Sequence, residues 1–180
     1  MRSVFSIWLL LSVYSSFAQT TLIGRAIRIL DGDTFEILVN DRATYKVRLT
    51  DIDAPEKKQD FGNVAKQQLA QFIFGKEVKV VYDKLDRNKR ILGHVYFQNQ
   101  YINLQMVSIG MAWHFKKYSK DAQFALAENK ARKQKLGLWI QPNPIAPWDY
   151  RGKRPKKKKS KKNYFREFTN KVSIIVEDLN

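Results

Sequence analysis

The chain has 180 residues, of which 44% are apolar, and this length allows one ordinary hydrophobic core with appendages. It contains no cysteine, which excludes a disulfide framework, a cysteine nucleophile, thiolate zinc sites and a lipid-modified N-terminal cysteine. The formal net charge of +16 suits a polyanionic partner, although a need for solubility or nonspecific adhesion would give the same composition.

The first eighteen residues indicate an export signal. Arg2 gives a basic start, the run VFSIWLLLSV is a short apolar core, and Ser16 and Ala18 are small residues at the two positions that a signal peptidase reads. A membrane anchor is the alternative, but it requires about 20 apolar residues, and this run has about half of that. We therefore expect cleavage before Gln19, no stable membrane insertion afterwards, and a periplasmic or secreted location.

Three strand patterns follow, joined by short turns. Apolar and polar residues alternate over residues 21–30, 34–40 and 43–52, with Asp-Gly and Asn-Asp turn pairs between the runs. Pro55 ends the third strand because it has no N–H to donate to the ladder. The three segments predict an antiparallel meander.

The rest of the body alternates between helix and strand patterns. Apolar residues at helical spacing run from Ala65 to Ile73, and Gly75 is suited to a left-handed cap. The remaining predicted elements are strands over 77–84 and 91–97, a short helix over 104–109, and a longer helix from the N-cap Asp121 to Gly137. This order predicts an α+β chain, a five-stranded OB-fold β-barrel with three helices.

The chain changes character near its C-terminus. Residues 141–148 contain three prolines and predict an extended closing segment, and residues 151–162 contain nine Lys/Arg and no acid, which predicts a disordered linker. Residues 163–180 form a tail of unknown role. Subtracting the linker's nine charges, the +1 of Arg2 and the −1 of the tail from +16 leaves +7 on residues 19–150, the single predicted domain.

Acidic residues gather in this basic chain at one place. Asp33 heads the second strand, and Asp53 and Glu56 follow the third. In an antiparallel meander these strand ends lie at the same edge, so we expect Asp33 and Asp53 to face each other, which requires a cation or a proton between them. A hard divalent ion such as calcium would satisfy both acids together with backbone carbonyls and water. The alternative is an ordinary Asp-Gly turn with a capping acid, and Asp51 is expected to be structural.

Two arginines accompany these acids. Arg48 lies on the polar face of the third strand, and Arg90 opens the fifth. Each alone is equally consistent with a solvated strand position. Together with Asp53 and Glu56, however, they supply what phosphodiester hydrolysis needs, because an ion and guanidinium groups stabilise developing charge while a carboxylate acts on water.

Histidine and aromatic residues give weaker indications. His94 and His114 lie among apolar neighbours, so we expect buried, hydrogen-bonded imidazoles and no metal ligation. The segment WHFKKYSKD mixes rings with lysines, a composition found both in cores and in surfaces that stack bases and bind phosphates. Tyr118 is the ring that we expect to be exposed.

Several motifs in one order carry a resemblance to a known family. They are DGDT at 31–34, R-L-x-x-I-D-A-P-E at 48–56, the turn before Arg90, GMAW at 110–113 and KLGLW at 135–139. The ordered set resembles the staphylococcal-nuclease (thermonuclease) family of secreted, calcium-dependent nucleases and spans roughly residues 22–140. The resemblance implies an OB-fold and cleavage of DNA and RNA at the 5′ P–O bond, leaving 3′-phosphates.

The resemblance also implies roles for single residues. The matching positions are Asp33 and Asp53 for the calcium-binding acids, Ala54 for a backbone carbonyl ligand, Glu56 for the general base, and Arg48 and Arg90 for two phosphate-binding arginines. The family's turn D-x-Y-G-R reads D-R-N-K-R at residues 86–90 here, with Lys89 in place of glycine. Arg87 is expected to replace a lysine contact to phosphate, and Tyr118 to stack on a base.

The sequence as a whole therefore predicts a secreted or periplasmic, monomeric, calcium-dependent nuclease whose substrates are DNA and RNA. One alternative is a non-catalytic OB-fold module that binds nucleic acid, which would be expected to lack the arginines or the glutamate. Another is an adhesion protein, for which deletion of residues 151–180 would abolish function.

Overall fold

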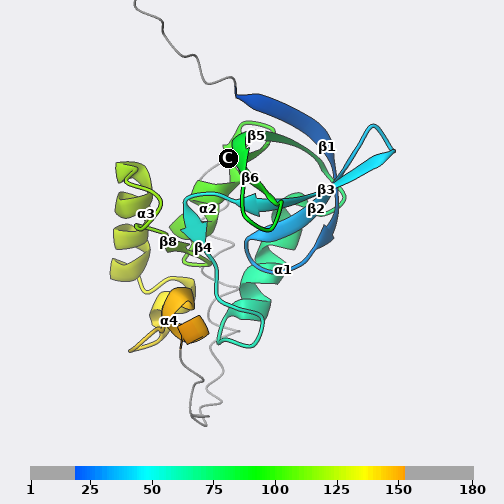
Figure 1. Cartoon of the computed structure of the whole chain (residues 1–180). Coiled ribbons are helices and arrows are strands. Elements are labelled where there is room, and N and C mark those ends of the chain that lie inside the picture. The colour runs from blue at the N-terminus through cyan, green and yellow to red at the C-terminus, as the bar shows by residue number, and fades with distance from the viewer. Residues whose placement is uncertain (1–18, 153–180) are drawn as a thin grey trace, which may run out of the picture.

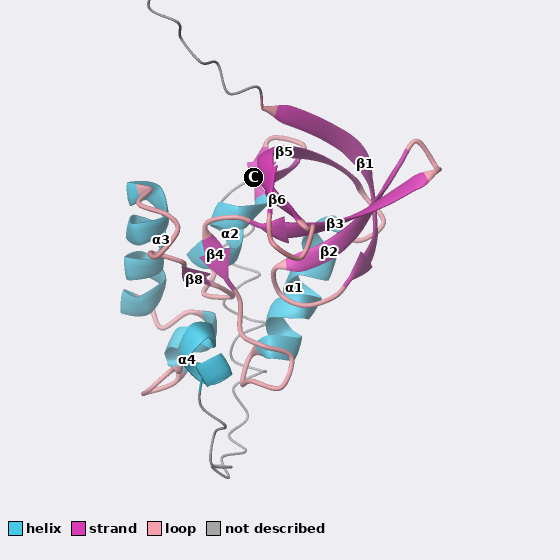
Figure 2. Cartoon of the chain, in the orientation of Figure 1, coloured by secondary structure: helices cyan, strands magenta, loops and turns pink. Residues whose placement is uncertain are grey.

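The computed structural model describes residues 19–152; the predicted signal peptide, the lysine-rich run from residue 153 and the tail lie outside the described residues. Five strands form a closed barrel (Figures 1 and 2). They are β1 (Thr20–Ile29), β2 (Thr34–Val39), β3 (Ala43–Leu49), β5 (Glu77–Leu85) and β6 (Ile91–Phe97). Their order is β3-β2-β1-β5-β6, and pairing of β3 with β6 closes the ring. The predicted α+β barrel of the OB-fold type is confirmed.

Closure depends on a long bent strand and on one tight crossing. The first half of β1 pairs with β5 and its second half with β2, with a register shift between Ala26 and Arg28. At the crossing of β3 and β6, a Cβ on Gly93 would lie 2.5 Å from Cγ1 of Val80 and 3.1 Å from Cγ1 of Val47. A side chain there would therefore force Val80 and Val47 to shift, so glycine favours the close packing at this point.

Helix α1 (Gly62–Ile73) lies below the barrel in the view of Figure 1 and seals its lower end. Its predicted apolar face is buried, with Ala65, Leu69 and Ile73 all fully covered. After the helix, Gly75 adopts φ +75°, the left-handed conformation expected of a glycine that follows a helix end. The helix thus contributes one continuous apolar stripe to the main core.

The predicted strand over 43–52 is interrupted, and this part of the prediction was wrong. β3 ends at Leu49, and Asp51 adopts φ 68°, a left-handed conformation that aspartate tolerates better than most residues. The chain then forms β4 (Ile52–Asp53), which pairs with β8 (Trp113–His114) outside the barrel. The kink therefore takes Asp53 out of the barrel ladder and fixes it against a later segment.

The C-terminal half adds further short elements around the barrel. They are β7 (Gln100–Tyr101), α2 (Ile102–Ser108), α3 (Ala122–Lys133), the 3-10 helix η1 (Gly137–Ile140) and α4 (Pro147–Gly152). The predicted N-cap is confirmed, because Asp121 accepts a hydrogen bond from Gln123 N at 2.8 Å. No helix among residues 19–152 is both long and apolar enough to cross a membrane.

Helix α4 corrects the end of the extended closing segment expected over 141–148, because Pro147 and Trp148 are helical while residues 141–146 belong to no helix or strand. Pro147 and Trp148 open this helix, since proline is well tolerated in a first helical turn, where its missing N–H has no partner to lose. Trp148 packs its ring against Trp113 and Phe115, with ring centres 5.5 and 5.4 Å away. These contacts fix α4 on the body next to β8.

Candidate active site

The register of β2 and β3 brings the predicted acids to one edge of the barrel. Thr34 pairs with Arg48 across the two strands, and Leu49 N donates a hydrogen bond to the carbonyl oxygen of Asp33 at 2.8 Å. The kink after β3 returns Asp53 to the same edge. The carboxylate-bearing residues Asp33 and Asp53 are 3% and 0% exposed. The expectation that these strand ends meet is confirmed.

Arg48 bridges the two buried carboxylates. Its two terminal nitrogens lie 2.8 Å from Oδ1 of Asp33 and 2.7 Å from Oδ1 of Asp53, and its side chain is 17% exposed. Burial disfavours the charge of this guanidinium, but the two carboxylates outweigh that effect and hold the pKa of Arg48 above its usual value. Burial raises the pKa of Asp33, against the opposing charge of Arg48. Arginine is therefore the cation that the acids share in the free protein.

Further donors complete the surroundings of Asp33. The N–H of Ala54 donates to Oδ2 of Asp33 at 2.9 Å, and the Thr34 hydroxyl donates to Oδ1 at 2.9 Å. Among residues 19–152, no group of three or more acidic, histidine or cysteine side chains is arranged to hold a metal ion.

Glu56 lies at the rim, one residue beyond Pro55. Its side chain is 40% exposed, and Oε1 accepts a hydrogen bond from the Arg151 guanidinium at 2.7 Å. Its backbone is fixed by two hydrogen bonds with Gln59. Glu56 N donates to Oε1 of Gln59 at 3.1 Å, and Gln59 N donates to the carbonyl oxygen of Glu56 at 2.8 Å. The candidate base is thus held in place but open to solvent.

The turn between β5 and β6 is organised by Asp86. Its Oδ1 accepts the N–H groups of Asn88 and Arg90 at 2.8 and 2.9 Å, and its Oδ2 accepts Nε of Arg90 at 2.8 Å. Burial opposes the Asp86 charge, but these hydrogen bonds prevail and hold its pKa below its usual value. Lys89 adopts φ 59°, the conformation that a glycine would favour. The turn therefore keeps its geometry with lysine at that position.

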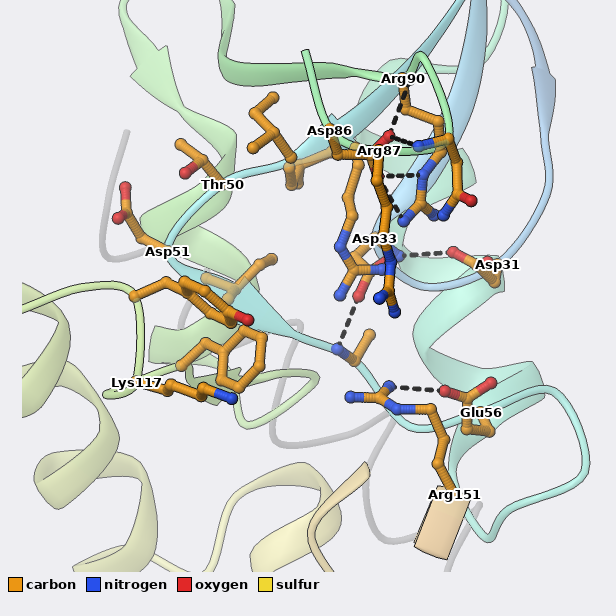
Figure 3. A pocket seen from close by; sticks show the side chains of 18 of the residues that line it. Asp31, Asp33, Thr50, Asp51, Glu56, Asp86, Arg87, Arg90, Lys117 and Arg151 are labelled. Atoms are coloured by element: carbon orange, nitrogen blue, oxygen red, sulfur yellow. Dashed lines mark hydrogen bonds and ion pairs between the residues drawn. The ribbon is translucent and has the colours of Figure 1, made fainter. Parts of the chain in front are cut away.

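A pocket of about 800 Å³ joins these parts (Figure 3). Of the residues predicted for the site, those lining it are Asp33, Arg48, Ala54, Glu56, Arg87, Arg90 and Tyr118. Asp53 lies behind the wall, fully buried. Tyr118 is 71% exposed, as expected, and lies edge-on to Phe115. Lys117 and Lys84 also line the pocket, so its walls carry lysines as well as arginines.

The two histidines differ from the expectation of buried, hydrogen-bonded rings. His94 is partly exposed; its Nδ1 lies 2.6 Å from the Tyr101 hydroxyl and 3.7 Å from Oδ2 of Asp51. His114 is buried against Phe124, but neither ring nitrogen has a hydrogen-bond partner among the described residues. Neither histidine lines the pocket, whereas Asp51 does.

Arg151 is the residue of the site that sequence reasoning missed. It was assigned to the lysine-rich linker, whereas it belongs to α4 and reaches Asp53 from 98 positions away, with one nitrogen 3.2 Å from Oδ1 and the other 2.7 Å from Oδ2. Figure 3 shows it and Glu56 pointing toward one another. The hydrogen bonds that Arg151 donates to Asp53 and Glu56 hold the pKa of Arg151 well above its usual value. The Pro-Trp-Asp sequence is a signal for the start of the helix, but it does not mark Arg151 itself.

Comparisons with known proteins identify relatives of this chain. The family model described as "Staphylococcal nuclease homologue" matches residues 46–141. The chain is 49% identical over 139 residues to a micrococcal nuclease of Shigella flexneri, covering 71% of this chain and 79% of that protein. It is 40% identical over 146 residues to an uncharacterized endonuclease of Haemophilus influenzae, covering 81% and 82%. An uncharacterized endonuclease of Escherichia coli is 43% identical over 129 residues, covering 71% and 84%.

Proposed function

The chain belongs to the staphylococcal nuclease family, and we propose that it is a calcium-dependent nuclease that hydrolyses phosphodiester bonds in DNA and RNA and leaves 3′-phosphates. One observation carries this proposal. Two buried carboxylates share one guanidinium: Asp33 and Arg48 line the floor of a pocket, Asp53 lies directly behind it, and the rim holds Glu56 and Arg90. The floor suits a cation, and the rim suits a phosphate and a water molecule.

The donor chemistry of the floor fits a hard divalent ion. Asp33 and Asp53 already converge on a single cationic group, so their oxygens lie close enough to share one charge. We assign the calcium ligands to these two carboxylates and the carbonyl oxygen of Ala54, with water completing the shell. When bound, the ion supplies positive charge that polarises a phosphoryl oxygen.

Glu56 is placed to act on water. Its carboxylate is open to the pocket, and Arg151 and the Gln59 contacts limit its motion. In the proposed step a water oxygen forms a bond to phosphorus, the water proton passes to Glu56, and the bond from phosphorus to the 5′-oxygen breaks. The 5′-oxygen takes up a proton and leaves as a hydroxyl, and the phosphate stays on the 3′ side.

Arg48 and Arg90 stabilise the charge that develops on the phosphate. A guanidinium carries five N–H donors in a fixed fork. Arg48 directs one terminal nitrogen to each buried acid, and Arg90 directs Nε and one terminal nitrogen to Asp86, so both retain donors for phosphate oxygens. The carboxylates thus fix the orientation of the two arginines before substrate arrives, which lowers the cost of reorganisation in the transition state.

The remaining features serve substrate binding. Tyr118 offers an exposed ring for stacking on a base, and Arg87 and Lys117 offer charges for the backbone of a single strand. We place the enzyme in the periplasm or outside the cell on the basis of residues 1–18, and as a monomer. The basic body then draws the polyanion toward the small acidic centre.

The test is cleavage of single-stranded DNA and RNA by the purified protein with calcium, with magnesium and with a chelator. We expect calcium-dependent cleavage whose products require phosphatase treatment before their 3′ ends can be extended. Asp53→Asn should abolish cleavage, whereas Asp41→Asn, which alters an exposed acid on the other side of the barrel, should not. Tight binding without cleavage under any divalent ion would instead support the non-catalytic module, and cleavage in chelator would contradict the calcium assignment.

A further inference from the structure

Arg151 enters the site from an element that is remote in sequence but firmly placed. Helix α4 is anchored by Trp148, whose ring lies parallel to that of Phe115 at 5.4 Å and edge-on to that of Trp113 at 5.5 Å. From this anchor the Arg151 guanidinium reaches both oxygens of Asp53 and one oxygen of Glu56. It therefore joins a proposed calcium ligand to the proposed base.

These contacts occupy most of the capacity of Asp53. An ionised carboxylate offers about four acceptor positions, and Asp53 accepts one bond from Arg48 and two from Arg151. A divalent ion that binds the same carboxylate would lie beside two guanidinium groups, and like charges at such short range repel strongly in a buried site. One of the two arginines must therefore give way when the ion binds.

The two arginines differ in how easily they can leave. The Arg48 side chain is 17% exposed, starts from a barrel strand and holds two buried acids at once. The Arg151 side chain is 42% exposed, starts from a short helix at the surface, and would leave Asp53 still paired with Arg48. Arg151 is thus the cation that a divalent ion would displace.

We propose that Arg151 is a third functional arginine of the site, which neutralises Asp53 and orients Glu56 in the free protein and turns to a substrate phosphate when a divalent ion takes its place on Asp53. This inference rests on the proposed function. Released from Asp53, the guanidinium remains beside Glu56 in the wall of the pocket, where a phosphate is the complementary anion for its planar fork. The exchange keeps the charge of the site nearly balanced before and after the ion binds.

If Arg151 is exchanged in this way, one variant should bind calcium more tightly and an oligonucleotide more weakly. In Arg151→Gln, calcium no longer competes with the Arg151 guanidinium for Asp53. The calcium affinity, measured by titration calorimetry without substrate, should therefore be about five-fold higher than that of the wild type. With calcium at saturation, a phosphorothioate-linked hexanucleotide, which resists hydrolysis, should bind about five-fold more weakly by fluorescence anisotropy. Arg151→Lys keeps the charge without the fork and should give smaller changes in both affinities.

The matched control is Arg28→Gln, which removes an arginine from an exposed two-bond pair with Glu36 on the barrel surface. It should change neither affinity, and thermal unfolding should show that both variants remain folded. A calcium affinity in Arg151→Gln equal to or weaker than that of the wild type would overturn the exchange. An unchanged oligonucleotide affinity would overturn the phosphate contact.

Failure of this inference and failure of the proposed function give different results. Hydrolysis of unmodified DNA is measured with the same preparations. If the wild type cleaves DNA with calcium while Arg151→Gln shows no tighter calcium binding, only the role of Arg151 is lost. If the wild type cleaves nothing with any divalent ion, the nuclease proposal falls, and if it binds no calcium, both proposals fall.

Discussion

Two buried acidic centres within residues 19–152 resemble each other in their electrostatics and differ in their surroundings. In the pocket, Asp33 and Asp53 are held by Arg48 and Arg151. On α3, Glu128 is 1% exposed and is held by Lys116 at 3.0 Å and by Arg132 at 3.2 Å. In both centres, cations from separate segments compensate a carboxylate that would otherwise be costly to bury.

The surroundings explain why only one of them suits catalysis. The Glu128 centre has a single acid and does not line the pocket, and its Arg132 is covered by aromatic rings, 3.7 Å from the ring centre of Trp139 and 4.8 Å from that of Trp113. The other centre has two acids, an open pocket, and an exposed third carboxylate at its rim. A buried ion pair by itself therefore indicates structure, and a second acid with open access indicates a reaction site.

The largest effect is expected at the rim. Glu56→Gln removes the group that accepts the water proton, and we expect the rate of cleavage to fall about 10³-fold, within the range of general base catalysis. Stability should hardly change, because the side chain is 40% exposed. Single-turnover cleavage and thermal unfolding measure the two effects. A large loss of stability would instead show that Glu56 is a structural residue, as Glu128 is.

Glu128→Gln tests the structural centre. Breaking a buried ion pair costs about 3 kcal/mol when the partner charges remain, although the partial exposure of Lys116 and Arg132 should reduce this toward 2 kcal/mol. Urea unfolding measures the loss. Cleavage per folded molecule should equal that of the wild type, and a specific loss of kcat in the folded variant would contradict the division between the two centres.

Arg48→Lys tests the bridge between the two acids. Lysine keeps the charge but cannot direct two nitrogens to two carboxylates, so we expect a loss of about 2 kcal/mol in stability and a 10- to 100-fold loss in cleavage. Arg28→Lys, in an exposed pair with Glu36, is the matched control and should change neither quantity measurably. If Arg48→Lys and Arg28→Lys showed the same stability and the same rate of cleavage, the contact of one guanidinium with two carboxylates would be unimportant.

The smallest effect concerns Asp86, an acid paired with an arginine at the edge of the pocket. Its pKa is lowered in the folded protein, so its contribution is present above the unfolded pKa of about 3.9 and is lost as the pH falls through the folded value. Asp86→Asn should therefore cost up to about 1 kcal/mol near pH 6 in urea unfolding, and this cost should shrink as the pH is lowered below the unfolded pKa. A cost that does not change with pH would assign the effect to hydrogen bonding alone.

The barrel, and the edge of it at which Asp33 lies, could be predicted from sequence because both depend on local pattern, whereas the exact position of Asp53 also depends on the kink at Asp51. Alternation in β2 and β3 and the short turn between them fix an antiparallel register, and this register places Asp33 beside Arg48. Residues at the two ends of a hairpin are close neighbours whatever the rest of the fold does. The apolar stripe of α1 and the cap at Asp121 follow from equally local rules.

The missed features depend on contacts between distant segments. The kink at Asp51 is stabilised by pairing of β4 with β8, about sixty residues later in the sequence. Arg151 reaches the site because Trp148 packs against the rings of Trp113 and Phe115, and no sequence pattern predicts that contact. A charged residue at the start of a lysine-rich run has no local pattern that separates it from its neighbours, so its role appears only in three dimensions.

The most direct test is to measure cleavage of single-stranded DNA, with calcium and with chelator, by the wild type, Glu56→Gln and Glu128→Gln side by side at a temperature where all three are folded. We predict calcium-dependent cleavage by the wild type and by Glu128→Gln, and almost none by Glu56→Gln. Cleavage that survives in Glu56→Gln, or that is lost in folded Glu128→Gln, would contradict the placement of the reaction at the pocket between β3 and α4.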